Sequence, residues 1–176
     1  MRELTSKRLM VLTISFALLF VFSVTTSLAQ QKMKIAGKMT CANVNREAIN
    51  IGDAEGHTMY LTEAEGINVS TGQQEFLDGA QVVSVSFSDL AKGNGPHQGY
   101  VKLAKKDDAA FRKYEGEVTT ILSADGTPMI TFKGTFSYIK GTGQLENIKG
   151  GGTYKGRYIS KTIYTVEWEG EYSIKK

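Results

Sequence analysis

Cysteine, proline and histidine are scarce in this sequence, which has one Cys, two Pro and two His among 176 residues. Because Cys41 is the only cysteine, no intramolecular disulfide can form, and stability must come from packing. The scarcity of proline and the absence of serine tracts exclude a disordered or linker-like chain. We therefore expect a folded domain that is held together by its core.

One long apolar run, residues 9–24, lies near the start of the chain. Basic side chains precede it, and the small residues Ser27 and Ala29 follow with the spacing of a signal peptidase site. The run is short for a membrane span of ~20 residues, which favours cleavage over an uncleaved anchor. We predict a signal peptide over residues 1–29 and export to the periplasm or the extracellular space.

A charge excess of either sign is also missing once residues 1–29 are set aside. The remaining 147 residues contain 18 Lys and Arg against 17 Asp and Glu, a net charge of +1. The basic character of the full chain is thus largely carried by the predicted signal peptide. This balance gives no reason to expect a nucleic-acid partner.

What the sequence does contain is period-two alternation, the pattern of a strand with one buried face. Turn residues separate the alternating segments, and no segment after residue 29 sustains a helical apolar period. The polar interval 63–80 is interpreted as a surface loop. We predict an all-β domain over residues 30–176 with eight or nine short strands, of which the four clearest lie at 33–41, 83–88, 130–138 and 164–172.

Eight antiparallel strands can close into a single β-barrel or split into a β-sandwich, and closure removes the exposed edges. Small barrels need glycines where their strands coil sharply. Gly37, Gly134, Gly156 and Gly170 each occupy an apolar-phase position inside an alternating segment. The glycines favour the eight-stranded antiparallel barrel, with the sandwich as the alternative.

A glycine-rich stretch carries a family resemblance. Residues 140–145 (KGTGQL) and the renewed strand that begins at residues 150–156 (GGGTYKG) resemble the signature of the allene oxide cyclase and dirigent-like barrels, which related bacterial secreted proteins also carry. Leu145 stands where that signature usually has an aromatic residue. The resemblance implies an eight-stranded antiparallel barrel with an apolar cavity that often forms homo-oligomers, and none of the family's catalytic residues can be placed on this chain.

Aromatic side chains are the main candidates for contact with a ligand. By alternation most of them share a face with the core aliphatics, so they either fill the barrel or line a cavity with apolar rings and hydroxyl groups. The six residues predicted to line such a cavity are Phe132, Phe136, Tyr138, Tyr154, Tyr158 and Trp168.

The two histidines, His57 and His97, each follow turn glycines and are predicted to be solvated loop residues. A metal site would need further ligands such as Asp53 to converge on them, and their spacing does not require this. We expect neither a metal nor a cofactor.

Three further sets of residues are predicted to be structural. Cys41 has the phase of a buried strand face and is interpreted as a structural thiol rather than a nucleophile. The alternating serines of 84–88 are interpreted as a solvent face, because no strained serine turn accompanies them. The glutamates of 167–171 share one polar face without an opposing acidic strand.

Three functional hypotheses follow. The first is a non-enzymatic exported barrel that binds a small apolar or amphipathic molecule. The second is a cyclase or isomerase acting inside the barrel, which predicts that a polar residue such as Glu115, Glu117 or Tyr158 points into a cavity. The third is an envelope interaction module that uses the polar strand faces or the segment 63–80.

Overall fold

Eight β-strands account for most of residues 32–175, the part of the chain that the computed structural model describes. The strands are β1 (Met33–Asn50), β2 (His57–Ser70), β3 (Gln81–Ala91), β4 (Gly95–Lys105), β5 (Asp108–Leu122), β6 (Pro128–Thr142), β7 (Ile148–Tyr158) and β8 (Ile163–Ile174). A single 3-10 turn, η1 (Gly143–Leu145), lies between β6 and β7. The predicted signal peptide falls outside the described residues. Within 32–175, no helix has the length and apolar character needed to span a bilayer.

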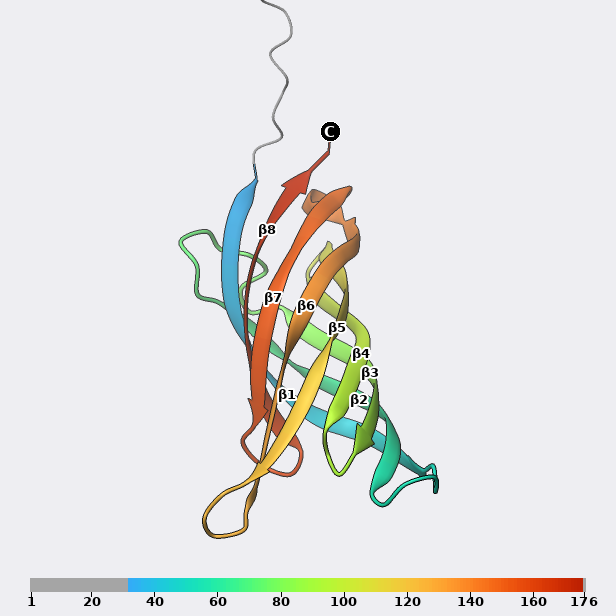
Figure 1. Ribbon diagram of the computed structural model, residues 1–176. Helices are drawn as coiled ribbons and strands as arrows, with labels where there is room; N and C mark the ends of the chain where they lie inside the picture. The colour runs from blue at the N-terminus through green and yellow to red at the C-terminus, as the bar shows by residue number, and fades with distance from the viewer. Residues whose placement is uncertain (1–31, 176) are drawn as a thin grey trace, which may run out of the picture. The chain divides into compact units, whose positions relative to one another are not determined.

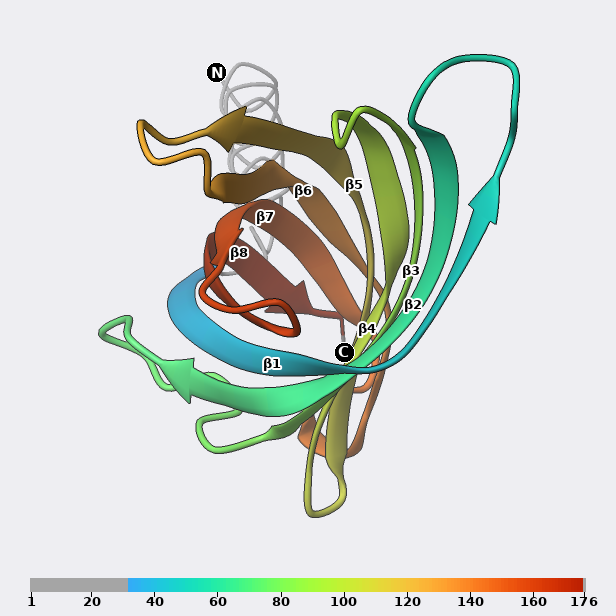
Figure 2. The same cartoon turned by 90° about the horizontal axis from the view of Figure 1, so that it is seen from below.

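The sheet closes on itself. Each strand pairs antiparallel with its neighbour in chain order, and β1 also pairs with β8, from Met33 opposite Tyr172 to Ala42 opposite Ile163. Figures 1 and 2 show the resulting ring of strands. The predicted single eight-stranded antiparallel barrel is therefore confirmed, and the sandwich alternative is excluded.

The up-and-down order of the strands gives the barrel two different ends (Figure 1). The connections 71–80, 106–107 and 143–147 lie at one end, which we call the plugged end. The four hairpin connections, 51–56, 92–94, 123–127 and 159–162, lie at the other end, which we call the mouth.

The connection 71–80 fills the plugged end. Phe76, at its centre, is only 2% exposed and packs its ring against Tyr138, Trp168 and Tyr172 at centroid distances of 5.8, 6.1 and 5.0 Å. The buried amide of Asn68 donates to the carbonyl oxygens of Phe76 and Leu77, which fixes the connection across the barrel. The prediction of a surface loop over 63–80 is wrong, because 63–70 belongs to β2 and the remainder carries a buried aromatic anchor.

The serines of β3 face the barrel interior. Ser84 is 6% exposed while its neighbour Val85 is 45% exposed, so the prediction that 84–88 forms a solvent face is wrong. Pairing explains the reversal, because directly opposed residues of neighbouring strands share a face of the sheet. Ser84 lies opposite the buried Ala64 on β2 and the buried Val101 on β4.

Several in-strand glycines lie beneath aromatic rings. A Cβ atom on Gly37 would come within 2.4 Å of the Trp168 ring, and one on Gly156 would come within 2.3 Å of the Phe132 ring. These contacts show why the positions cannot carry a side chain. The glycines therefore do more than relieve curvature, since they make room for the interior rings.

Candidate functional site

A cavity of about 970 Å³ occupies the interior of the barrel. Its inner wall includes Trp168 and Val82, both buried, and its outer wall includes Thr127 and Lys161 in the hairpin connections of the mouth. The cavity thus extends from the plugged end to the mouth.

Five of the six predicted ligand-contacting residues line this cavity: Phe132, Phe136, Tyr154, Tyr158 and Trp168. Their rings meet mostly edge to face, as between Phe136 and Trp168 (6.3 Å, 87°), a favoured aromatic arrangement. Tyr138 is not part of the lining; it is 5% exposed and packs beneath the cavity against Phe76 and Phe136. The role of these residues in binding a ligand stays a prediction.

His97 and Tyr154 form a hydrogen bond across the interior. In the paired register, His97 on β4, Gly116 on β5, Gly134 on β6 and Tyr154 on β7 form one row across the sheet. The Tyr154 hydroxyl passes over both glycines, where a Cβ atom would approach it to 2.6 Å, and lies 2.9 Å from Nε2 of His97. The row of glycines is therefore what lets two strands so far apart in the ring share a hydrogen bond.

Burial keeps this pair uncharged. It lowers the pKa of His97 to about 4, and it raises the pKa of Tyr154 above its ordinary value. At neutral pH a neutral imidazole therefore faces a neutral phenol. The prediction of a solvated loop position is wrong for His97, which is 9% exposed and packs against the rings of Tyr114 and Phe132.

Arg112 on β5 is the functional candidate that the sequence reasoning missed. Its side chain lines the cavity and is only 2% exposed. One guanidinium nitrogen donates to the Tyr138 hydroxyl at 2.9 Å, and the guanidinium carbon lies 4.2 Å from the Trp168 ring centroid and 4.4 Å from that of Phe136. Period-two counting could have found it, because Arg112 has the phase of the buried Ala110 and Val118.

Two buried polar atoms beside the cavity have no hydrogen-bond partner within residues 32–175: Nε of Arg112 and Oδ1 of Asn43. The amide nitrogen of Asn43 donates to the Tyr158 hydroxyl at 3.2 Å. Tyr158 therefore points into the cavity as the enzymatic hypothesis expects, whereas Glu115 and Glu117 are exposed on the outer face. Buried polar atoms without a partner cost stability, and neither of these two atoms is itself open to the cavity.

Cys41 lines the same cavity as a buried thiol, as predicted. Burial raises its pKa to about 11, although a hydrogen bond with Tyr164 opposes part of that shift. A thiol that stays protonated at neutral pH is a poor nucleophile. The structural interpretation of Cys41 is therefore consistent with its surroundings.

The charges on the cavity wall have one sign. Arg46, Arg112, Arg157 and Lys161 line the cavity, and its lining contains no aspartate or glutamate. Acidic side chains of the neighbouring strands lie on the outer face, as in the exposed pair of Lys155 with Glu167 at 3.2 Å. Cationic side chains thus accompany the aromatic lining from the inner wall to the mouth.

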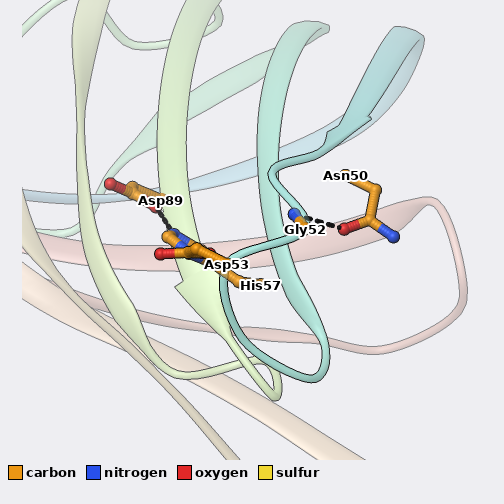
Figure 3. A network of polar contacts seen from close by, with 5 residues as sticks. All are labelled: Asn50, Gly52, Asp53, His57 and Asp89. Carbon is orange, nitrogen blue, oxygen red and sulfur yellow. Dashed lines mark hydrogen bonds and ion pairs between the residues drawn. The ribbon is translucent and has the colours of Figure 1, made fainter.

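His57 is the first residue of β2, at the mouth, and its ring lies between two carboxylates (Figure 3). Its Nδ1 lies 2.5 Å from a carboxylate oxygen of Asp53 and its Nε2 lies 2.6 Å from one of Asp89. These contacts tie the connection 51–56 to β3 and raise the pKa of His57, chiefly through the hydrogen bond with Asp89. Within residues 32–175, no group of three or more His, Cys, Asp or Glu side chains is arranged so that it could hold a metal ion.

No protein-family model matches the chain. No curated protein matches it either. Two solved structures of similar fold are those of the pterocarpan synthase dirigent proteins PsPTS1 (TM-score 0.47, 8% identity, 83% of this chain and 97% of that one) and GePTS1 (TM-score 0.48, 10% identity, 86% of this chain and 94% of that one). Both are dirigent proteins by name, and with TM-scores under 0.5 the likeness decides no part of the predicted family resemblance, which stays a prediction. At this level of similarity they carry no conclusion about what this chain binds.

Proposed function

We propose that this protein is exported and binds one small apolar or amphipathic molecule inside its barrel. The observation that carries the proposal is the interior cavity of about 970 Å³ that extends to the mouth. Sites for small organic molecules fall in the range of roughly 300–1,000 Å³ and combine apolar walls with a few polar groups. The tyrosine rings and hydroxyls of the lining supply both.

The residues of β3 explain why this half of the barrel is not filled by its own side chains. An eight-stranded barrel is just wide enough to be packed with side chains or to hold one small ligand. Ser84, Ser86 and Ser88 line the cavity where larger residues would fill it. Small polar side chains at successive inward positions therefore leave space and add hydroxyl groups.

The test uses N-phenyl-1-naphthylamine, a neutral apolar dye whose fluorescence rises in an apolar site. We expect saturable binding by the purified protein and at least a tenfold loss of affinity in Ser86→Phe, which places a ring in the cavity. Val85→Phe is the matched control, since Val85 is the next residue of the same strand and points outward. Absence of binding, or equal binding by both variants, contradicts the proposal.

Native mass spectrometry offers an independent test. Protein purified without detergent should carry a small organic molecule that solvent extraction releases. Reproducible recovery of ligand-free protein, together with failure to take up any extracted lipid or aromatic molecule, would lead us to abandon the binding proposal.

Catalysis in the same cavity is a second candidate function, and the pair of His97 and Tyr154 favours it. Because both groups stay neutral, they are a weak base and a weak acid at neutral pH, and their role is to orient a reactive substrate by hydrogen bonds, which suits an isomerisation or cyclisation without a cofactor. If the molecule extracted from the protein is a product, its precursor should be converted by the wild type. Conversion should fall at least a hundredfold in Tyr154→Phe and His97→Gln, and unchanged conversion in both excludes the role.

A further inference from the structure

We infer that the molecule bound in the cavity carries an anionic head group, a carboxylate, and that Arg112 binds it at the inner wall. The inference rests on the proposed binding function and names the class of ligand. It depends on one juxtaposition: a buried guanidinium without an acidic partner among residues 32–175 borders a cavity whose charged lining residues are all cationic.

Arg112 has no acidic counter-ion among residues 32–175. Arginine remains protonated in proteins, so Arg112 brings a positive charge into the barrel. The five salt bridges of residues 32–175 all involve other side chains, and no acidic residue is among the buried ones in that range. Buried charges in proteins are normally paired or solvated by a dense set of hydrogen bonds, and Arg112 has one such bond to a neutral phenol.

Aromatic rings stabilise the positive charge of Arg112 in part. The ring centroids of Trp168 and Phe136 lie within 4.4 Å of the guanidinium carbon, and such cation–π contacts stabilise a desolvated cation. The cost of removing an ion from water is larger than this gain. The rings therefore offset only part of the cost, while they restrict the orientation of the guanidinium.

The guanidinium has five N–H donors in a planar fork that matches the two oxygens of a carboxylate. The contact with Tyr138 uses one nitrogen, and Nε has no partner among the described residues. Nε is closed to the cavity, so an anion at the inner wall accepts hydrogen bonds from the Nη nitrogens, which carry N–H groups beyond the one that Tyr138 accepts.

The cationic side chains of the lining produce an electrostatic field along the cavity. Arg46, Arg157 and Lys161 lie nearer the mouth, and among residues 32–175 no carboxylate lines the space between them and Arg112. A low-dielectric cleft with charges of one sign attracts ligands of the opposite sign. The apolar body of such an anion then lies along the aromatic wall between Arg112 and the mouth.

The test compares a carboxylate with its neutral isostere. Binding of 2-naphthoate and 2-naphthamide, and of decanoate and decanamide, is measured by calorimetry with the wild-type protein and with Arg112→Met and Arg112→Lys. We expect at least one acid to bind the wild type about 10- to 100-fold more tightly than its amide, the range for loss of a charged hydrogen-bonded contact. Arg112→Met should abolish this preference without changing amide binding, and Arg112→Lys should retain part of it.

Lys155→Gln is the matched control, because Lys155 on β7 is exposed, pairs with Glu167 and does not line the cavity. It should change acid binding by less than about threefold at physiological salt, where exposed charges are screened. Naphthalene-1-sulfonate replaces the flat carboxylate with a tetrahedral anion, and binding as tight as that of 2-naphthoate overturns the assignment of a carboxylate.

The outcomes separate the two proposals. Equal binding of acid and amide by the wild type overturns the anionic head group and leaves the binding function intact. An acid preference that persists in Arg112→Met overturns the role of Arg112. Failure of all four compounds and of the neutral dye overturns both. If Arg112→Met does not fold, the ratio of acid to amide affinity of the wild type still tests the anionic head group. The same ratio in Tyr138→Phe, which loses the hydroxyl that holds the guanidinium, then tests the role of Arg112.

Discussion

The plugged end and the mouth of the barrel are built from the same strands yet differ in how their interior is filled. At the plugged end, Phe76, Leu103 and Ile148 are at most 2% exposed, and the connection 71–80 packs into the barrel. At the mouth, inward positions carry serines, tyrosines and a histidine around an open volume. Stability therefore resides mainly at one end, and the other end is free to carry a site.

Arg112 lies at the boundary between these two regions. Its guanidinium lies near Phe76 of the plug (5.7 Å) and also lines the cavity. A polar group at this depth costs stability unless something pairs with it. Substitutions at one end of the barrel should therefore have effects that matched substitutions at the other end lack.

The largest effect is expected for the plug. Phe76→Ala should lower the free energy of unfolding by about 3–5 kcal/mol, because it leaves a hole among packed rings. Phe132→Ala should cost less, since the half-buried Phe132 ring already borders the cavity. Denaturant unfolding of both variants measures the difference, and equal losses would show that the mouth contributes as much to the core as the plug does.

The second-largest loss of stability is expected in the row of Gly116 and Gly134, which lies between His97 and Tyr154. A Cβ atom on Gly134 would lie 2.0 Å from the carbonyl oxygen of Glu115 and 2.6 Å from the Tyr154 hydroxyl. Gly134→Ala should therefore destabilise the barrel by about 1–3 kcal/mol and displace Tyr154 from His97. Thr135→Ala, at the exposed next position, is the control, and denaturant unfolding is the measurement. Equal stability of the two variants contradicts the close approach.

The fold could largely be predicted from the sequence because alternation and turn residues are local signals. The segments 33–41 and 130–138 alternate cleanly, and both lie in strands of the confirmed barrel. The loop predicted over 63–80 failed where a tertiary contact decided the outcome. Nothing local marks Phe76 as an anchor in a polar stretch, because its partners come from β6 and β8.

The candidate site was predictable only in part, for a related reason. The ring-bearing residues of β6 to β8 share a phase with aliphatics, which alternation detects. The phase of β3 could not be read from its sequence, since 82–88 offers valines at both phases and only pairing with Ala64 and Val101 fixes it. Polarity alone predicts exposure, which is why the sequence indicates a solvated position for His97 and no site role for Arg112.

The two histidines should respond to pH with opposite sign. His97 has a folded pKa of about 4 against an ordinary value near 6.5, so the unfolded chain binds its proton first and stability falls as pH drops through that window. His57 has a raised pKa, so its contribution is full below pH 6.5 and is lost as pH rises through its folded value. NMR titration of the imidazole protons assigns each value. His97→Gln should flatten the acidic limb of stability and His57→Gln the alkaline one; the reverse assignment contradicts the placement of both.

Arg112→Met should have the smallest effect on stability, although its effect on the binding of an acid should be large. Arg112→Met removes the cost of burying a charge and also the cation–π contacts with Trp168 and Phe136, which offset only part of that cost. In the absence of ligand, its free energy of unfolding should stay within about 1 kcal/mol of the wild type or exceed it. Arg112→Lys keeps the charge and is the control. A loss of more than about 3 kcal/mol in the free energy of unfolding of Arg112→Met would show that the arginine stabilises the plugged end. An unchanged or higher stability would show that the barrel does not need this charge in order to fold. Binding of an anion in the cavity would then be the reason for the charge.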